Sequence, residues 1–198
     1  MENNKKYRLI LASGSPRRKE ILGNTGLEFE IKTSDKEEII NTTVPQDAVL
    51  ALSAQKAEFV GEEVSGDVCI IGADTVVSYR NEILGKPKNK EDAIRMVSEL
   101  AGDTHRVFTG VTILVKEDGK EVKRSSFYVE TLVDVYSMSK KEIDEYVESG
   151  EPMDKAGAYA IQGLFAPYIK KIDGDYYNIV GFPISKIYHE LKNLEIVK

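Results

Sequence analysis

The run DVCIIGADTVV, residues 67–77, constrains the fold of this chain more than any other stretch. Its residues are almost all apolar, without the alternation that marks a strand with one face in water. Such a run is typical of a strand that is buried on both faces, as in an α/β sheet. The sequence therefore predicts a central strand over residues 67–77 with further structure packed on each side of it.

Signals for strands and helices alternate along the first half of the chain, and an antiparallel hairpin follows them. The patterns predict strands over residues 7–12, 29–33, 107–115, 126–136, 158–162 and 168–172. They predict helices over residues 16–22, 45–60, 90–100, 140–150 and 183–194. We therefore expect an α/β fold in which helices flank both faces of a mixed, twisted central sheet that carries a cleft.

Length and composition narrow the class of protein. The chain has 198 residues, 41% hydrophobic and 30% charged, and we expect residues 1–198 to form a single globular domain. No apolar stretch approaches the roughly 20 residues that span a bilayer, and the polar start MENNKKY does not resemble a signal peptide. The lone Cys69 excludes an intrachain disulfide and a cysteine-based zinc cluster. These features predict a cytoplasmic protein that does not bind a membrane.

The net charge of −6 disfavours a general nucleic-acid-binding surface, so a local cluster of cations is informative. Such a cluster lies in SGSPRRKE, residues 13–20, where a helix capped by Ser15 and beginning at Pro16 follows a strand. A helix start offers free backbone N–H groups to an anion, but it disfavours a cation such as Arg17. Either a bound phosphate compensates Arg17, whose planar fork suits phosphate oxygens, or the arginine is simply solvated.

Two charged residues interrupt apolar patterns. Lys56 shares a helix face with Leu52 and Phe59, so it either extends along the helix to solvent or reaches an anion in a cleft. Asp74 interrupts the apolar strand directly after a Gly-Ala pair. Its carboxylate is either an edge residue with a local contact, or it is paired, protonated or bound to a metal ion. Ligands and catalytic groups gather at strand ends in α/β sheets, which favours a functional Asp74.

Three further stretches could complete a ligand site. The turn LGKP contains Lys86, which is either an exposed lysine or a phosphate contact, and the acidic loop SDKEE, residues 34–38, could hold Mg²⁺. EPMDKAGAYAIQG, residues 151–163, combines small residues with Gln162. Small residues allow a flat ligand to approach closely, and a glutamine amide can both donate to and accept from a base edge. Together these residues predict a site for a polyphosphate, a metal ion and a base.

Taken in order, SGSPRRKEIL, SDKEE, QKA, GADTVV, LGKP, HRVFTGV, EPMDKAGAYAIQG and GDYYNIVGFPI resemble the Maf family over nearly the whole chain. The resemblance implies an elongated mixed α/β fold, similar to inosine-triphosphatase (Ham1) enzymes, with a cleft between two lobes. It implies a nucleoside triphosphate pyrophosphatase that cleans the nucleotide pool and is linked to division arrest. The form DKAGAYAIQG is similar to the branch that acts on dTTP and UTP rather than on 7-methyl-GTP.

The resemblance also implies roles for particular residues. It places the proton acceptor at Asp74 and a divalent cation, Mg²⁺ or Mn²⁺, at Asp74 and Glu38. The loop departs here from the common family form SDVDE, because a lysine enters it and Glu37 replaces an aspartate. Substrate-binding positions, including those for specificity, fall on Ser13, Arg17, Lys56, Thr75, Lys86 and Gln162. A homodimer is implied in the same way.

Two other classes of function use the same phosphate site. A non-catalytic nucleotide-binding regulator of septum formation would bind the nucleotide and a division partner without needing Asp74 as a base. A phosphomonoesterase would need a phosphatase nucleophile motif, and none is evident in the sequence. Separate detection of pyrophosphate and orthophosphate distinguishes all three.

Overall fold

The computed structural model describes residues 7–198. Residues 1–6, which make up most of the polar stretch that argues against a signal peptide, lie outside the described part. The strands are β1 (Arg8–Ala12), β2 (Glu30–Ile31), β3 (Val68–Tyr79), β4 (Glu82–Leu84), β5 (Thr104–Glu117), β6 (Lys120–Val135) and β7 (Ile169–Asp173). In the described part they form one seven-stranded mixed sheet in the order β2-β1-β3-β5-β6-β7, with β4 paired to β3.

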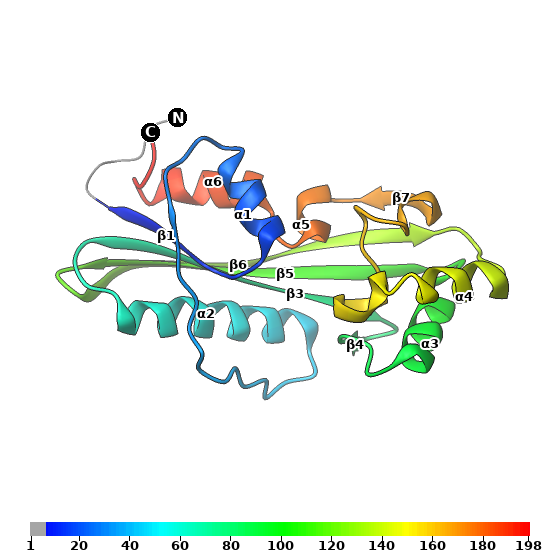
Figure 1. The fold of residues 1–198 in the computed structure, drawn as a ribbon. Coiled ribbons are helices and arrows are strands. Elements are labelled where there is room, and N and C mark those ends of the chain that lie inside the picture. Colours follow the sequence, from blue (N-terminus) through cyan, green and yellow to red (C-terminus); the bar gives the residue numbers. More distant parts are fainter. Residues whose placement is uncertain (1–6) are drawn as a thin grey trace.

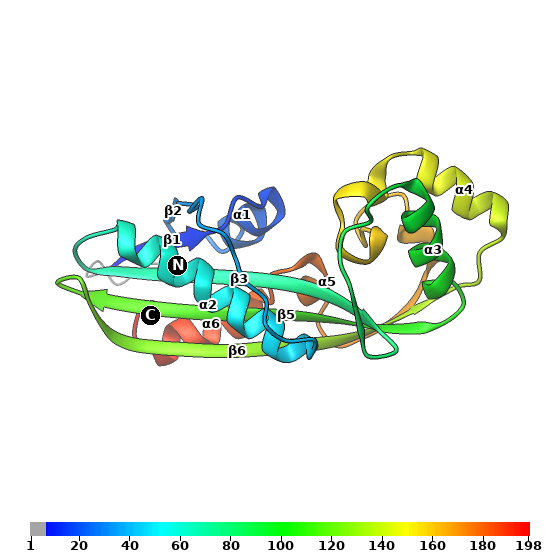
Figure 2. The same cartoon turned by 90° about the horizontal axis from the view of Figure 1, so that it is seen from below.

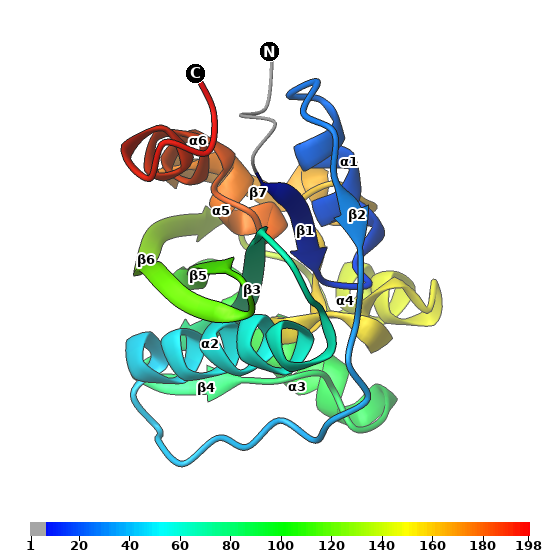
Figure 3. The same cartoon turned by 90° about the vertical axis from the view of Figure 1, so that its left-hand side faces the viewer.

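Helices cover both faces of this sheet. They are α1 (Pro16–Gly23), α2 (Pro45–Glu63), α3 (Lys90–Leu100), α4 (Lys140–Glu148), α5 (Tyr176–Val180) and α6 (Ile184–Asn193), with short 3₁₀ helices η1 (Glu151–Asp154), η2 (Ala156–Ala158) and η3 (Ala166–Tyr168). Viewed along the strands, α2 lies on one face, and α1, α5 and α6 lie on the other (Figure 3). The expected α/β architecture is confirmed. Among the described residues, no helix is both long and apolar enough to cross a bilayer.

The central strand predicted from the apolar run is β3, and it is buried along almost its whole length. Its first five residues pair in parallel with β1, and nearly the whole strand pairs antiparallel with β5. Cys69 lies in the core with no exposed surface. Because β1 reaches only as far as Gly72 of β3, the part of β3 that follows has no strand beside it on that side until β4 begins.

The elements divide into two lobes along the long strands β3, β5 and β6 (Figures 1 and 2). One lobe carries α1, α2 and α6. The other carries α3 and α4 together with the 3₁₀ segments that follow α4 (Figure 2). Because the same strands run through both lobes, each lobe is attached to the sheet rather than to a flexible linker.

Two glycines allow α2 to pack closely on the sheet. A Cβ atom at Gly72 would lie 2.3 Å from the backbone oxygen of Ser53, and one at Gly110 would lie 2.2 Å from that of Val49. Any side chain at these positions would collide with helix backbone. The close approach brings α2 over the middle of β3, where Asp74 pairs in register with Gly110.

The strand predicted over residues 158–162 is wrong. The structure has η2 there, followed by turns, because Gly157 and Ala158 adopt left-handed backbone angles with φ of 68° and 58°. Glycine adopts that conformation freely and alanine only at a steric cost, and an extended strand excludes it. Sequence patterns also missed β4 and α5, which are only a few residues long. The other elements appear where they are predicted, with their ends shifted by a few residues.

Candidate active site

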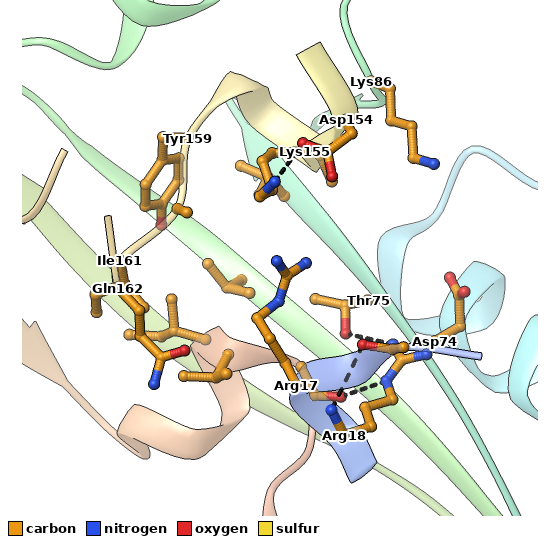
Figure 4. Close-up of a pocket in the computed structure, with 18 of the residues that line it drawn as sticks. Arg17, Arg18, Asp74, Thr75, Lys86, Asp154, Lys155, Tyr159, Ile161 and Gln162 are labelled. Carbon is orange, nitrogen blue, oxygen red and sulfur yellow. Dashed lines mark hydrogen bonds and ion pairs between the residues drawn. The ribbon is translucent and has the colours of Figure 1, made fainter. Parts of the chain in front are cut away.

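A cavity of about 450 Å³ lies between the two lobes, beside the part of β3 that β1 leaves uncovered (Figure 4). Its walls come from the start of α1, the middle of β3, the turn at Lys86, the segment Asp154–Gln162 and the end of α5. The expected cleft therefore exists. It is of a size typical for small-molecule sites.

The sequence around the start of α1 presents its cations to this cavity. The Ser15 side chain caps the helix by accepting a hydrogen bond from the Arg18 backbone N–H, and Pro16 occupies the first turn, as the sequence predicts. The first turn contains no acidic residue, so no carboxylate within that turn offsets Arg17. The Arg17 side chain is exposed and extends into the cavity (Figure 4). This arrangement suits an anion bound at the helix start.

Arg18, which the sequence analysis did not single out, is held more firmly than Arg17. Its Nε donates to the backbone oxygen of Gly181 at 2.8 Å, Nη1 to Ser13 Oγ at 3.2 Å, and Nη2 to Thr75 Oγ1 at 3.2 Å. Burial lowers the pKa of Arg18, and the negative charge of Asp74 acts in the opposite direction. A guanidinium keeps its proton in proteins, so Arg18 is a fixed cation in the cavity wall. Neighbouring arginines look alike in sequence, and only tertiary contacts distinguish them.

Ser13 lies behind the cavity wall and supports Arg18. It is buried, it does not line the cavity, and its hydroxyl accepts from Arg18 and from the backbone N–H of Ser15. Ser13 thus links the end of β1 to the guanidinium. The structure places this predicted substrate-binding residue one layer behind the cavity surface.

Lys56 reaches from α2 to Asp74, and its Nζ lies 3.1 Å from Asp74 Oδ1. The same ammonium contacts the carboxylate of Glu38. The side chains of Lys56 and Asp74 are 17% and 19% exposed, so this ion pair is largely shielded from solvent. The ammonium thus pairs with two carboxylates of the protein, and Lys56 itself is not among the residues that line the cavity. Asp74 is likewise paired and lies in the interior of β3.

Glu38 is positioned by contacts between its loop and α2. The side-chain amide of Gln55 accepts from the backbone N–H of Ile39 and donates to the backbone oxygen of Ile39, both at 2.8 Å. This two-sided contact fixes the backbone next to Glu38. Glu38 itself is not part of the cavity wall and approaches Asp74 through their shared partner, Lys56.

The opposite wall belongs to the second lobe and carries Lys86, Asp154, Lys155 and Gln162 (Figure 4). The Lys155 side chain is only 14% exposed and pairs with Asp154, whose pKa it holds below the usual value. A hydrogen bond of 3.0 Å from the Gly157 N–H to the Gly85 oxygen ties this wall to the turn of Lys86. Asp154 and Lys155 were not predicted individually, although the segment containing them was.

Gln162, in the second lobe, and Thr75, on the shared strand β3, both line the cavity. The Gln162 side chain is exposed, so its amide is available to a ligand. The Thr75 hydroxyl, in contrast, contacts Arg18 and Thr109. Small residues, Ala156 and Ala160, lie in the wall between the charged groups and leave room for a flat ring.

The residues present fit a divalent cation only in combination with a substrate. Among residues 7–198, no three His, Cys, Asp or Glu side chains gather closely enough to hold a metal ion. Asp74 and Glu38 do converge on one cationic group, the Lys56 ammonium. Mg²⁺ typically uses one or two carboxylates and takes its other ligands from phosphates and water. Asp74 and Glu38 therefore supply what a metal bound with a polyphosphate would require.

Comparison with known proteins identifies relatives along nearly the full chain. A family model described as "Maf-like protein" matches residues 8–194. The dTTP/UTP pyrophosphatase of Lachnoclostridium phytofermentans is 48% identical over 190 residues, covering 96% of both chains. The protein of the same name from Agathobacter rectalis is 48% identical over 200 residues, covering 95% of this chain and 98% of its own. That from Bacillus anthracis is 48% identical over 190 residues, covering 96% of both.

Two solved structures resemble this one more distantly. The Staphylococcus aureus Ham1 protein matches with a TM-score of 0.43 and 12% identity, covering 94% of this chain and 98% of its own. A nucleoside-triphosphatase, named dITP/XTP pyrophosphatase, from Mycobacterium abscessus matches with a TM-score of 0.39 and 11% identity, covering 70% of this chain and 76% of its own.

Proposed function

The chain belongs to the Maf family, and on that premise we propose that it hydrolyses nucleoside triphosphates, above all dTTP and UTP, to the monophosphate and pyrophosphate. Relatives named dTTP/UTP pyrophosphatase match nearly its whole length. The activity removes unwanted nucleotides from the pool. One observation carries the proposal: cationic side chains from both lobes line a single cavity in which Asp74 is the carboxylate on the central strand.

The cations suit a triphosphate because they approach it from two sides. Arg17 and Arg18 lie at the start of α1, and Lys86 and Lys155 lie on the opposite wall. Fixed positive groups stabilise charge that develops on the transferring and leaving phosphates, and they need no reorganisation to do so. Arg18 is the best fixed of these groups, because three protein acceptors hold its guanidinium.

We assign the role of general base to Asp74, the carboxylate of the central strand that lines the cavity. It accepts the proton of a water molecule that attacks the α-phosphorus, so that the P–O bond to the β-phosphate breaks and pyrophosphate leaves. Lys56 holds the Asp74 carboxylate in place through its contact with Oδ1. When bound at Asp74 and Glu38, a divalent cation, Mg²⁺ or Mn²⁺, would neutralise phosphate charge and make the attacking water more acidic.

Base recognition falls to Gln162. Its amide can donate to a carbonyl oxygen and accept from N3–H, a combination that uracil and thymine share and cytosine lacks. Leaving polar groups unpaired on binding costs about 1 to 3 kcal/mol each, which gives roughly tenfold discrimination or more per contact. The enzyme therefore prefers dTTP and UTP over CTP. Purine triphosphates are disfavoured by the larger size of their bases rather than by these hydrogen bonds.

A panel of dTTP, UTP, CTP, GTP and 7-methyl-GTP with Mg²⁺ or Mn²⁺ tests the proposal when pyrophosphate and orthophosphate are measured separately. We expect pyrophosphate and the monophosphate as products, highest kcat/KM with dTTP and UTP, and a changed ranking in Gln162→Glu. Orthophosphate as the product would instead indicate a phosphatase. Nucleotide binding without turnover would indicate the non-catalytic regulator of septum formation.

The family resemblance supports three further parts of the proposal: a cytoplasmic location, a homodimer and a link to division arrest. Analytical ultracentrifugation tests the homodimer, and a monomeric mass over the concentrations used in activity assays would reject it. Fractionation of cells tests the location.

A further inference from the structure

Thr109 lies on β5 directly behind the cavity and has no exposed surface. Thr109 does not line the cavity, but it pairs in register with Thr75, which does line it. The two hydroxyl oxygens are 2.9 Å apart. The Thr109 hydroxyl is also 2.9 Å from the backbone oxygen of Asn178 in α5. Thr109 therefore connects Thr75, a residue of the site, to α5.

The direction of each hydrogen bond in this chain follows from chemistry. The backbone oxygen of Asn178 can only accept, so Thr109 uses its hydroxyl hydrogen to donate to it. Thr109 must then accept from Thr75, which uses the hydrogen of the Thr75 hydroxyl. The Thr75 oxygen consequently turns its lone pairs toward Arg18, whose Nη2 donates to it at 3.2 Å. The hydroxyl hydrogens of Thr75 and Thr109 therefore both have an acceptor.

The far end of the chain is itself fixed. The side-chain amide of Asn178 donates to the backbone oxygen of Val107 at 3.0 Å and to Thr131 Oγ1 at 2.9 Å. Asn178 has no exposed surface. The Gly181 oxygen, just beyond α5, accepts from Arg18 Nε at 2.8 Å. Arg18 is therefore held by α5 twice, directly at Gly181 and indirectly through Thr75 and Thr109.

We propose that Thr109 is a positioning residue that sets the orientation of the Thr75 hydroxyl and, through it, holds the Arg18 guanidinium in place for the phosphates of the substrate. The proposal rests on the proposed pyrophosphatase function. Without an acceptor at residue 109, the Thr75 hydrogen loses its partner and can turn toward Arg18, where it opposes the guanidinium hydrogens. Arg18 then loses one of its three anchors.

Thr109→Val tests this directly, because valine keeps the shape of threonine and removes the hydroxyl. We expect kcat/KM for UTP to fall about ten- to a hundredfold, the usual scale when a catalytic group is displaced slightly. Thr109→Ser restores the hydroxyl and should recover most of the activity. Thr112→Val is the matched control: Thr112 is equally buried on β5, and its hydroxyl contacts Ser53 and Ser126, both at 3.1 Å, away from the cavity.

The comparison between the two valine variants separates positioning from stability. Both remove a buried hydroxyl from one strand, so both should lower the melting temperature. Thr109→Val should lose much more activity than Thr112→Val. Equal kinetics in the two variants, or a Thr109→Ser enzyme as impaired as Thr109→Val, would overturn the proposal.

A measurement on Arg18 itself does not depend on turnover. The NMR signal of the Arg18 Nε–H, assigned by its loss in Arg18→Lys, should exchange slowly with solvent in the unmodified chain and faster in Thr109→Val. If the unmodified chain is inactive, but its Arg18 Nε–H exchanges more slowly than that of Thr109→Val, the proposed function is contradicted and the positioning role is supported. If the unmodified chain is active and its Arg18 Nε–H exchanges as fast as that of Thr109→Val, the positioning role alone is contradicted.

Discussion

At the scale of single residues, the site is organised around one ammonium group. Lys56 contacts the carboxylates of Asp74 and Glu38, which come from the central strand and from a loop. The three groups are oriented by separate elements, α2, β3 and the segment held by Gln55. Loss of Lys56 would remove the shared partner of both carboxylates, and loss of either carboxylate would leave Lys56 with one partner instead of two. The effects of changes at these three residues on activity should therefore not be additive.

Asp74→Asn should abolish most turnover while the protein remains folded. The substitution is nearly isosteric and removes the base without removing volume. We expect kcat to fall by roughly 10² to 10⁴, the usual contribution of a general base. The measurement is steady-state release of pyrophosphate, with Asp173→Asn, at the exposed end of β7, as a control that keeps full activity. Near-normal turnover in Asp74→Asn would refute its role as the base.

Lys56→Met should lower both activity and stability. Methionine keeps the apolar stem, but it leaves Asp74 and Glu38 facing each other without a cation. We expect kcat/KM to fall about tenfold or more and the melting temperature to decrease. Lys90→Met is a suitable control, because Lys90 bridges Glu148 at 2.8 Å with its side chain 53% exposed, and exposed ion pairs contribute little. Full activity in Lys56→Met would mean that its contact with Asp74 has no function.

At the scale of elements, the contact between α2 and the sheet places Lys56. Gly72 and Gly110 lie on neighbouring strands, and in both cases the nearest atoms are helix backbone. The residue pattern of α2 predicted the helix and its apolar face, but not how close it lies to the sheet. That distance depends on the two glycines, which in sequence are indistinguishable from turn glycines.

Gly110→Ala should destabilise the fold by about 2 kcal/mol or more, because its Cβ would lie 2.2 Å from the Val49 backbone oxygen. Gly23→Ala is the control: a Cβ there meets nothing within 4 Å, and alanine is the better helix former. Urea unfolding measures both. Similar unfolding midpoints for the two variants would show that α2 does not pack as closely as described.

Elements with a strong local signal were predicted well. The helix over residues 90–100 matches α3, whose start is capped by Asn89, and the capping box of Ser139 and Glu142 begins α4. The strand predicted over residues 158–162 is wrong because Gly157 and Ala158 turn the backbone into the left-handed region. The small residues of this segment show no hydrophobic periodicity that would distinguish such turns from a strand.

At the scale of the whole molecule, the cavity joins segments that are far apart in sequence. Resemblance to a family could place Asp74, Thr75 and Gln162 in one site, but periodicity alone could not. Arg18 was not predicted because its role depends on a contact with Gly181, which lies far away in the sequence. Lys155 was not predicted because no local pattern indicates that its side chain is largely buried in the cavity wall.

The stability of the whole molecule should decrease in acid partly through His105. This buried residue contacts the Tyr159 hydroxyl at 2.7 Å, and burial lowers its pKa to about 4. In the unfolded chain, the pKa of histidine is near 6.5. The unfolded state therefore binds a proton first as the pH falls, and stability is lost between about pH 6.5 and about pH 4.

We expect this loss to reach about 3 kcal/mol and to be absent in His105→Gln. The free energy of unfolding in urea is measured for the unmodified chain and for His105→Gln at about pH 7.5 and about pH 4.5. The difference between the two decreases gives the contribution of His105, because the titration of the carboxylates that both proteins share cancels. The same decrease in both proteins would show that His105 is not responsible.

The most direct test of the central claim, that water attacks the α-phosphorus in this cavity, is hydrolysis of UTP in water enriched in oxygen-18. Mass spectrometry of the products locates the new oxygen atom. We predict that one labelled oxygen enters UMP, that the pyrophosphate is unlabelled, and that the reaction is abolished in Asp74→Asn. Label in pyrophosphate, or release of labelled orthophosphate, would contradict it.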